Sequence, residues 1–211
     1  MLRKAAEDAR HLVNRGYPKT SAIRFVSDHY RLPEEHRFVL SRVVVGAKTA
    51  QLRKKKSVLP EALHDQEVLV DGYNVLITVE SLIGGRPVYR CDDGFLRDTQ
   101  GIFRSYRTSD LTVSALQEIL IFLARLNPAS IVILLDQQIS MSGRLAALMR
   151  EMMAKIGLPG TARTVRDADH QLKSSRAIVA TADGNVIDAA THVIDLPWEI
   201  ARRRGSPVEV L

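Results

Sequence analysis

The sequence predicts an α/β fold, in which helices cover both faces of a parallel sheet, preceded by a small, basic, all-helical domain. From residue 67 onward, short runs rich in Val, Ile and Leu alternate with segments of helical spacing, a pattern typical of parallel strands joined by helices. Residues 1–66 show helical spacing alone, and they hold 14 Lys and Arg against 7 Asp and Glu, whereas residues 67–211 hold 16 against 17. The change in both spacing and charge indicates two domains.

Composition limits the class of protein. The chain has 211 residues, enough for two small domains with buried cores. Its longest apolar runs are about seven residues, short of the roughly 20 needed to cross a bilayer, and charged residues follow Met1 where a signal peptide would be apolar. We therefore expect a cytoplasmic protein without a membrane partner. Cys91 is the single cysteine, which excludes an internal disulfide and a cysteine-based zinc site, and we interpret it as a packing residue.

The basic N-terminal part is expected to be helical throughout. Helical spacing predicts helices within residues 3–17, 21–30 and 34–56, the last beginning after a proline. The turn between the second and third helices resembles a helix-turn-helix hairpin, which also occurs in proteins that bind no nucleic acid. We place the helical domain at residues 1–58, a linker at 59–66 and the α/β domain at 67–211.

The excess positive charge of the helical part suggests a polyanionic partner. It ends in a basic run that is a candidate phosphate contact: Arg53, Lys54, Lys55 and Lys56. The alternative is a solvated helix end with no ligand. Nucleic acid is the partner expected from the first interpretation.

The second part alternates strands and helices in sequence order. Apolar runs predict strands at residues 67–71, 130–136, 162–167, 177–183 and 191–197. Helical spacing, with Gly or Pro as stop signals, predicts helices at residues 115–126, 142–158, 168–175 and 198–205. This alternation is the basis for the parallel sheet with helices on both faces.

Three of the predicted strands are apolar runs that end in an aspartate in the same way: Asp71, Asp136 and Asp183. Since the carboxyl ends of parallel strands share one edge of the sheet, we expect these side chains to converge where open sheets bind ligands. Asp167 and Asp169 lie at the junction of another, shorter strand and a helix, and they would add to the group. Like charges at close range repel each other, and a bound cation removes that cost. Carboxylates without His or Cys favour Mg²⁺ or Mn²⁺, although an aspartate after a strand can also be only a helix cap.

The segment between residues 80 and 107 is longer and more polar than a simple connection, and its Gly84-Gly85 pair suggests a hairpin. Asp92 and Asp93 could supply a further metal ligand or form a turn. The segment also interleaves aromatic and basic side chains that could stack on bases and contact phosphates, or bridge to the acidic edge or a second subunit. The arginines are Arg86, Arg90, Arg97, Arg104 and Arg107, and the aromatic residues are Tyr89, Phe95, Phe103 and Tyr106.

The start of the predicted helix at 142–158 is a second candidate phosphate site. Ser140 and Ser142 precede or begin this helix, and Gly143 removes side-chain bulk there. Two hydroxyls and free helix-start amides can bind an anion, and ordinary N-capping is the alternative. His170 is a candidate proton shuttle, or a bystander on the first turn of its helix.

Four segments, "LVDGYNVL", "VILLD", "DADHQL" and "IVATADGNVID", are similar in order and spacing to the signature positions of PIN-like nuclease domains, including their NYN and flap-nuclease relatives. The resemblance covers about residues 67–200, and its most specific parts are the Asp-x-x-Asn of "DGYN" and the Thr-x-Asp of "TADGN". With "NRGYPKTSAI" in a basic helical part, the whole chain resembles microbial proteins in which domain of unknown function 434 precedes a PIN-like domain. The resemblance implies a Rossmann-like three-layer α/β/α fold and metal-dependent cleavage of RNA or DNA.

The resemblance also assigns roles to individual positions. It implies metal-ligating acids at three strand ends and on one helix, namely Asp71, Asp136, Asp183 and either Asp167 or Asp169. Asn74 matches the polar residue beside the first acid, and Thr181 matches the hydroxyl that supports the last. Asp169 matches the position of the helix-borne metal ligand slightly better than Asp167 does, because its helix continues "HQL".

The expected reaction is hydrolysis of a phosphodiester by in-line attack of water, without a covalent enzyme intermediate and with RNA favoured over DNA. One alternative is a nucleic-acid-binding protein with a degenerate, non-catalytic PIN-like domain. A small-molecule phosphohydrolase is less favoured, because Gly72 and Tyr73 follow Asp71 where such enzymes place a second acid. PIN-like proteins often dimerise, and the segment 80–107 would suit a homodimer contact.

Overall fold

The computed structural model describes residues 1–101 and 106–211, so the expected roles of Phe103 and Arg104 lie outside the described residues. The chain forms two compact units. Unit 1 comprises Met1–Lys55, Pro87–Gly101 and Pro207–Leu211, and unit 2 comprises Lys56–Arg86 and Ile102–Ser206. These units differ from the expected division at residues 58 and 66, because part of the segment 80–107 packs with the N-terminal helices.

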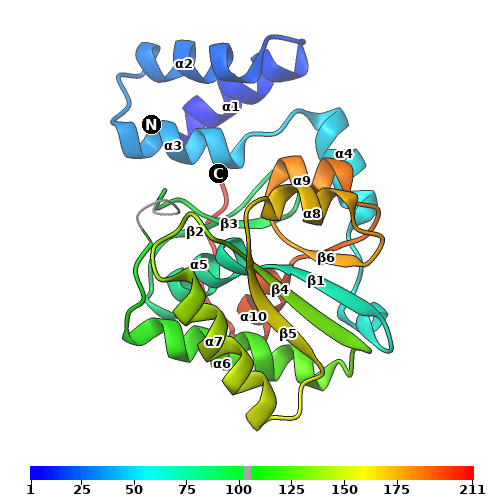
Figure 1. Cartoon of the computed structure of the whole chain (residues 1–211). Coiled ribbons are helices and arrows are strands. Elements are labelled where there is room, and N and C mark those ends of the chain that lie inside the picture. The colour runs from blue at the N-terminus through cyan, green and yellow to red at the C-terminus, as the bar shows by residue number, and fades with distance from the viewer. Residues whose placement is uncertain (102–105) are drawn as a thin grey trace. The chain divides into compact units, whose positions relative to one another are not determined.

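Unit 1 combines helices with a small antiparallel hairpin (Figure 1). Its elements are α1 (Leu2–Asn14), α2 (Lys19–His29), α3 (Glu34–Val43), α4 (Ala47–Lys56), β2 (Val88–Arg90) and β3 (Leu96–Asp98). The single helix expected at residues 34–56 is two helices, because Val44 takes an extended conformation at the end of α3. A hairpin lies within the segment 80–107, but its turn falls between Arg90 and Leu96, whereas Gly84 ends α5.

The core of unit 1 brings the first three helices together on small side chains. Ala5, Ala6 and Ala9 of α1 are completely buried and pack in one cluster with Val26 of α2 and Leu40 of α3. Alanines at this spacing leave room for the larger side chains of the neighbouring helices. A second small cluster joins α3 to the hairpin and the C-terminal tail through Val39, Val43 and Cys91, with partly buried Leu211 beside them. Cys91 is thus the packing residue that the sequence indicated.

A buried ion-pair network fixes the hairpin within unit 1. Asp93 is fully buried and its two carboxylate oxygens lie 2.8 and 2.7 Å from the guanidinium nitrogens of Arg97, while Arg53 of α4 donates to it at 2.8 Å. Burial alone would raise the pKa of Asp93, but the hydrogen bonds and charges of Arg97 and Arg53 lower it below its usual value. Asp92 is likewise paired with Arg10 of α1. The network connects three separate segments of the chain.

Unit 2 is an α/β unit with a five-stranded parallel sheet (Figure 1). Its strands are β1 (Glu67–Asp71), β4 (Ser130–Asp136), β5 (Gly160–Val165), β6 (Ile178–Ala180) and β7 (Val193–Ile194). Its helices are the short 3-10 helix η1 (Pro60–Leu63), α5 (Gly72–Ile83), α6 (Asp110–Arg125), α7 (Ser142–Lys155), α8 (Ala168–Ser174), α9 (Gly184–Ala189) and α10 (Leu196–Arg204). All five predicted strands are present, whereas the helices α5 and α9 were not predicted.

The strand order is β5-β4-β1-β6-β7, with every neighbouring pair parallel. Counted along the chain, this is the order 3-2-1-4-5. The chain therefore builds outward from β1 to one edge and then crosses to the other side of β1 to add β6 and β7. Such a reversal leaves a crevice at the carboxyl ends of the two central strands, here β1 and β6.

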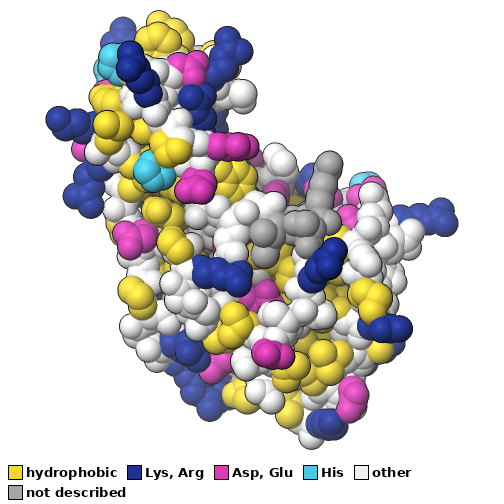
Figure 2. Space-filling view, turned by 90° about the vertical axis from the view of Figure 1, so that its left-hand side faces the viewer, with side chains coloured by type: hydrophobic (Ala, Val, Ile, Leu, Met, Phe, Trp, Pro, Cys, Tyr) yellow, Lys and Arg dark blue, Asp and Glu magenta, His cyan; other side chains and the backbone are white. Residues whose placement is uncertain are grey.

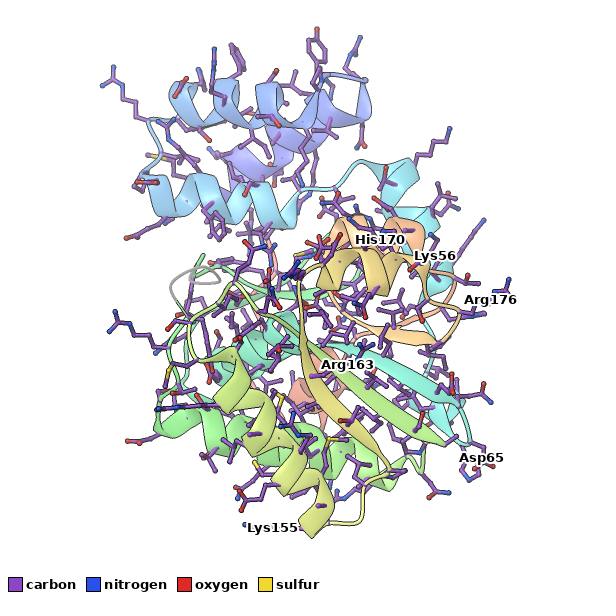
Figure 3. The ribbon with its side chains drawn as sticks, in the orientation of Figure 1. Lys56, Asp65, Lys155, Arg163, His170 and Arg176 are labelled. Carbon is purple, nitrogen blue, oxygen red and sulfur yellow. The ribbon has the colours of Figure 1, made fainter. Side chains whose placement is uncertain are left out.

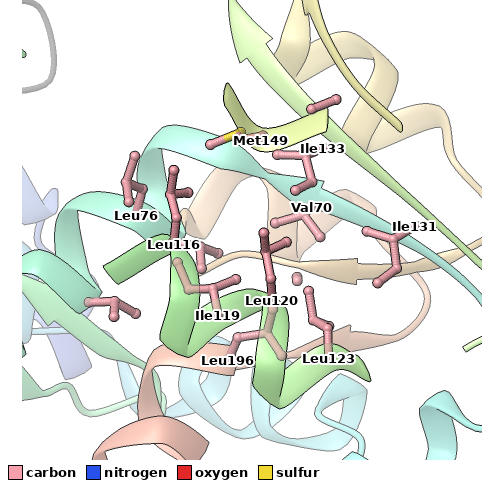
Figure 4. Packing of buried hydrophobic residues seen from close by; sticks show 14 of the residues in the cluster. Val70, Leu76, Leu116, Ile119, Leu120, Leu123, Ile131, Ile133, Met149 and Leu196 are labelled. Atoms are coloured by element: carbon pink, nitrogen blue, oxygen red, sulfur yellow. The ribbon is translucent and has the colours of Figure 1, made fainter. Parts of the chain in front are cut away.

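The main core lies on one face of this sheet (Figure 4). Val70 of β1 and Ile133 of β4 pack there against Leu116 and Leu120 of α6 and Leu196 of α10. Each fully buried aliphatic side chain of this kind contributes roughly 1.5–3 kcal/mol. In the part of the chain that is described, no helix has the length and apolar character needed to cross a membrane.

A close approach between α5 and β4 fixes the position of the first helix after β1. Gly72 is the first residue of α5, and a Cβ atom there would lie 2.7 Å from the carbonyl oxygen of Leu134 and 2.7 Å from Cδ2 of Leu135. Only glycine allows this approach without a backbone shift. It holds the start of α5 against the carboxyl end of the sheet.

Candidate acidic site at the carboxyl edge of the sheet

The centre of the site is a hydrogen-bonded group at the ends of β1 and β6. Thr181 Oγ1 donates to Asp71 Oδ2 at 2.8 Å and accepts from the backbone N–H of Asp183 at 3.1 Å. The backbone N–H of Ala182 donates to Asn74 Oδ1 at 2.8 Å. The side chains of Asp71 and Asn74 therefore meet the hydroxyl of Thr181 and the backbone N–H of Ala182 across the crevice between these strands. The hydroxyl of Thr181 is fully buried, which fixes its geometry.

Each acid in this group also caps the helix that follows it. Asp71 is the N-cap of α5 and accepts from the backbone N–H of Asn74 at 3.4 Å. Asp183 is the N-cap of α9, where its Oδ1 accepts from the N–H groups of Asn185 and Val186 at 2.8 and 3.1 Å. Capping thus accounts for part of the reason why aspartate occupies these positions. It uses one oxygen of Asp183 and leaves the other without a hydrogen bond to the described residues.

Electrostatics show that three of the acids are close enough to affect one another. Burial raises the pKa of Asp71 to about 7, although the hydrogen bond from Thr181 opposes the shift, and the negative charges of Asp183 and Asp169 raise it further. Within residues 1–101 and 106–211, neither Asp71 nor Asp183 forms an ion pair with Lys or Arg. Among the described residues, the carboxyl groups of Asp71 and Asp183 therefore have no basic side chain that neutralises them.

Asp136 and Asp167 occupy neighbouring positions on the same edge. Asp136 is the last residue of β4, and its carboxylate accepts from the backbone N–H of Gln138 at 2.8 Å. Burial raises the pKa of Tyr73 to about 12, and the negative charge of Asp136 adds to that shift. Asp167 is the exposed N-cap of α8 and accepts from the N–H of His170 at 3.0 Å. Asp169 is exposed and lies 3.7 Å from Lys173. Figure 3 shows His170 on α8.

The acids are not gathered tightly enough to hold a metal ion in the conformation described. Among the described side chains, no three or more His, Cys, Asp or Glu residues form such a group. The donor types are nevertheless those that a hard divalent cation prefers, since all are oxygens and several are anionic. The edge therefore offers the oxygen donors that a divalent cation prefers, but the described side chains do not surround a common point.

A cavity of about 480 Å³ opens beside this edge. Its walls come from the start of α5, from the segment before α6 and from the β4–α7 connection, and they include Tyr73, Tyr106, Arg107, Thr108, Ser140 and Met141. The volume falls within the range of pockets that hold small molecules. Tyr73 and Tyr106 are almost fully buried and pack edge to face against each other, with ring centroids 5.3 Å apart. The polar groups that line the cavity include the guanidinium of Arg107 and the hydroxyls of Thr108 and Ser140.

The β4–α7 connection differs from the expected anion pocket. The helix begins at Ser142, but its N-cap is Met141, in the left-handed conformation with φ 65°, and no side chain caps it. Ser140 lines the cavity, whereas Ser142 is buried. Neither expectation for this pair, a two-hydroxyl pocket or a serine cap, matches the local structure, and Ser140 alone faces the cavity.

Several expected nucleic-acid contacts in the segment 80–107 and in α4 have structural partners in place of a ligand. Arg97 is buried against Asp93, and Tyr89 and Phe95 pack within unit 1. Asp92 and Asp93 are held by arginines and are not metal ligands, because those guanidinium groups already neutralise them. Arg86 is exposed and Arg90 is half-buried in β2.

The basic run at the end of α4 has mixed roles. Arg53 belongs to the buried network with Asp93. Lys56 donates to the carbonyl oxygens of Ile187 at 2.9 Å and Asp188 at 2.6 Å. Lys54 and Lys55 are exposed. Half of the run therefore stabilises the fold, because a cation near the carbonyls at a helix end forms favourable hydrogen bonds.

One acid at this edge, Asp195, was not predicted from the sequence. Asp195 directly follows β7, is buried, and caps α10 by accepting from the N–H of Trp198 at 3.0 Å. Because Ile194 pairs with Ala180, Asp195 follows β7 as Thr181 follows β6. The run "HVID" carries the same signal as "VLVD", an apolar strand ending in aspartate, and could have revealed it.

Fold and site together define an α/β protein with a helical N-terminal part, a five-stranded parallel sheet flanked by helices, and an acidic carboxyl edge on that sheet. The chain belongs to the family described as "Domain of unknown function (DUF5616)", which matches residues 60–199. The family described as "Protein of unknown function (DUF434)" matches residues 1–56, as the N-terminal resemblance predicted.

A relative shows that both parts occur together elsewhere. An uncharacterised protein of Methanocaldococcus jannaschii is 35% identical over 197 residues, which cover 92% of this chain and 94% of that protein. No solved structure matches the chain.

Proposed function

We propose that the chain is a nuclease that hydrolyses phosphodiester bonds of nucleic acid, RNA in preference to DNA, with Mg²⁺ or Mn²⁺, and that unit 2 has a Rossmann-like fold of the PIN-like type. The observation that carries the proposal is the contact between the ends of β1 and β6, where Asp71, Asn74, Thr181 and Asp183 form one hydrogen-bonded group. This group lies where the strand order reverses, which is where open parallel sheets bind their ligands.

The donor set fits a hard divalent cation in type and charge. Asp71, Asp169 and Asp183 would hold the ion, with Asp136 at the neighbouring strand end, and a bound ion would activate water and stabilise the charge that develops on phosphate. Because these acids are not gathered around a common point, binding requires their side chains to rotate. The exposure of Asp169 and the partial exposure of Asp183 permit this. The effect of its charge on Asp71 favours Asp169 over Asp167 as the helix-borne acid.

The remaining residues have supporting roles in this proposal. Thr181 would orient the Asp71 carboxylate by its hydrogen bond, and Asn74 would tie the end of β6 to α5. The adjacent cavity would hold part of the nucleic acid, with Arg107 beside a phosphate and the hydroxyls of Thr108 and Ser140 within the same cavity.

The test is degradation of an end-labelled single-stranded RNA with Mg²⁺, with Mn²⁺ or with a chelator. The parent should degrade the RNA only with a divalent ion, and Asp71→Asn should reduce degradation to background while leaving the fold intact by circular dichroism. Glu151→Gln is the matched control, since it removes one exposed carboxylate from α7 and should cleave at the parent rate. Cleavage by Asp71→Asn at the parent rate would contradict the proposal.

A second candidate function is nucleic-acid binding without catalysis. It is favoured by two observations: Asp71, Asp136 and Asp183 each accept a hydrogen bond from a turn or helix-start N–H, and no metal-binding group is assembled in the described residues. The same experiment separates the two functions. RNA that is bound by the parent but stays intact with either ion identifies the binding protein.

A further inference from the structure

The second helix presents an unusual outer face. Ala22, Ile23 and Val26 of α2 are buried in unit 1, while Phe25, on the opposite side, is 67% exposed. A single exposed apolar residue is ordinary on a protein surface and indicates nothing by itself. Whether Phe25 can bind a ligand therefore depends on the residues around it.

Phe25 borders a shallow hollow of about 430 Å³ whose other walls are polar. They are formed by Thr20, Ser21, Arg24, Asp28 and His29. Arg24 forms no ion pair within residues 1–101 or 106–211, so its guanidinium is available to a ligand. The carboxylate of Asp28 is bound by Arg37 at 2.7 Å, which offsets its negative charge. The hollow thus combines an exposed aromatic ring, a free cation and two hydroxyls.

The charge of unit 1 indicates the kind of ligand. Unit 1 holds 15 Lys and Arg and 9 Asp and Glu, whereas unit 2 holds 15 of each. The whole formal net charge of the protein, +6, therefore resides on unit 1. Figure 2 shows Lys and Arg side chains gathered on the visible surface of the N-terminal helices. A unit with this charge attracts a polyanion.

We propose that this face of α2, formed by Thr20, Ser21, Arg24, Phe25 and His29, binds single-stranded nucleic acid. An unpaired base stacks on the ring of Phe25, and Arg24 contacts an adjacent phosphate. Aromatic rings beside basic groups bind single strands in this way with little sequence preference, because every base has a flat face. Bases within a duplex are already stacked and cannot use the ring. The inference does not require the nuclease activity proposed for unit 2.

The experiment measures binding of the full-length protein to short fluorescent oligouridylate and oligothymidylate in a chelator, so that no divalent ion is present. Phe25→Leu keeps an apolar side chain but removes the stacking surface, and it should weaken binding about tenfold, in line with the usual contribution of one stacked base. Phe25→Trp should bind like the parent, and its added indole fluorescence should be quenched by the oligonucleotide. Arg24→Gln should lower the slope of log affinity against log salt by about 0.7.

Two controls make the result specific. Ile156→Ala truncates an exposed apolar side chain of unit 2, 44% exposed, and should bind like the parent. A duplex of matched length should bind more weakly than either single strand, and binding of either single strand supports the proposal.

The proposal is overturned if Phe25→Leu binds both single strands as tightly as the parent, if the duplex binds equally well, or if the parent binds neither strand. These outcomes are independent of cleavage. Binding is measured in a chelator, so a loss of binding at Phe25 is read without any contribution from metal-dependent cleavage.

Discussion

Asp71 combines a helix-capping hydrogen bond with a partly buried, negatively charged environment. Its pKa is raised to about 7 by burial and by the charges of Asp183 and Asp169, whereas an unfolded aspartate has a pKa near 3.8. The folded protein therefore binds a proton at Asp71 over a pH range in which the unfolded chain has released it. Stability from this residue is fully present below the lower pKa and is lost as the pH rises through about 7.

This gives a prediction for Asp71→Asn. The neutral amide avoids the cost of a buried charge, so the variant should gain stability relative to the parent as the pH rises from 4 to 8, by roughly 1–2 kcal/mol after allowance for solvent screening. Urea unfolding of both proteins in a chelator, across this pH range, measures the difference. A difference that stays constant with pH would show that the Asp71 carboxyl titrates normally.

At the scale of residues, the sequence was informative where a pattern repeated. The ending of apolar runs in aspartate anticipated that Asp71 and Asp183 would lie at one edge, because parallel topology leaves few other arrangements. The sequence was less informative for Asp93 and Arg97. For Asp93 it left a metal ligand and a turn as alternatives, and for Arg97 it left a phosphate contact and a bridge to the acidic edge or a second subunit. A buried ion pair and an exposed charge look alike in a sequence, since burial of a charge depends on a partner from a distant segment.

At the scale of elements, the strands were predictable because each is a short run of Val, Ile and Leu with clear ends. The helix α5 was missed, since "YNVLITVESLI" is rich in β-branched residues and has no helical stripe that distinguishes it from a strand. All but two of its residues are buried or nearly so, which removes the polar face that marks an amphipathic helix. The break after α3 had a local signal, the run Val43–Gly46.

The position of α5 depends on Gly72. Gly72→Ala should destabilise the protein by about 1–3 kcal/mol, because the added methyl group overlaps the backbone of Leu134 and the side chain of Leu135. Thermal unfolding measures the loss, and Gly143→Ala is the control, since no atom lies within 4 Å of a Cβ atom there. Equal melting temperatures for the two variants would contradict a close approach of α5 to β4.

The hairpin of unit 1 depends on Asp93. Asp93→Asn should lower the free energy of unfolding by about 3–5 kcal/mol near neutral pH, because Arg97 would be left buried without its counter-charge. The pKa of Asp93 is lowered in the folded protein, so its contribution is present above the unfolded value and is lost as the pH falls through the folded one. Denaturant unfolding should therefore show a parent–variant difference that shrinks on acidification below pH 4. A difference unchanged at low pH would argue against the ion pair as its source.

At the scale of the whole molecule, the division into domains was the hardest feature to anticipate. Charge and periodicity placed the end of the helical domain at residue 58. The DUF434 match ends at residue 56, and the DUF5616 match begins at residue 60. Nothing in the sequence of Pro87–Gly101 indicates that it packs with helices about 40 residues or more away, because the contacts of Cys91 and Asp93 are long-range.

This arrangement makes a prediction for a fragment of residues 57–211. It retains the hairpin but lacks α3, whose Val39 and Val43 pack in one cluster with Cys91 and Tyr89, so these two side chains should become exposed and cause association. The same fragment with residues 87–101 replaced by a short Gly-Ser linker should remain monomeric. Size-exclusion chromatography with a hydrophobic dye distinguishes them, and identical behaviour would show that the hairpin does not depend on the helices.

The interleaving of the units also constrains how such genes can evolve. The DUF5616 match spans Pro87–Gly101, although this segment packs with the helices of the DUF434 part. Recombination at the border between the two family matches would produce a gene that encodes the hairpin but not the helices that pack against it. Lineages that keep the downstream half alone should therefore have deleted or rewritten that hairpin, and a survey of such genomes can check this.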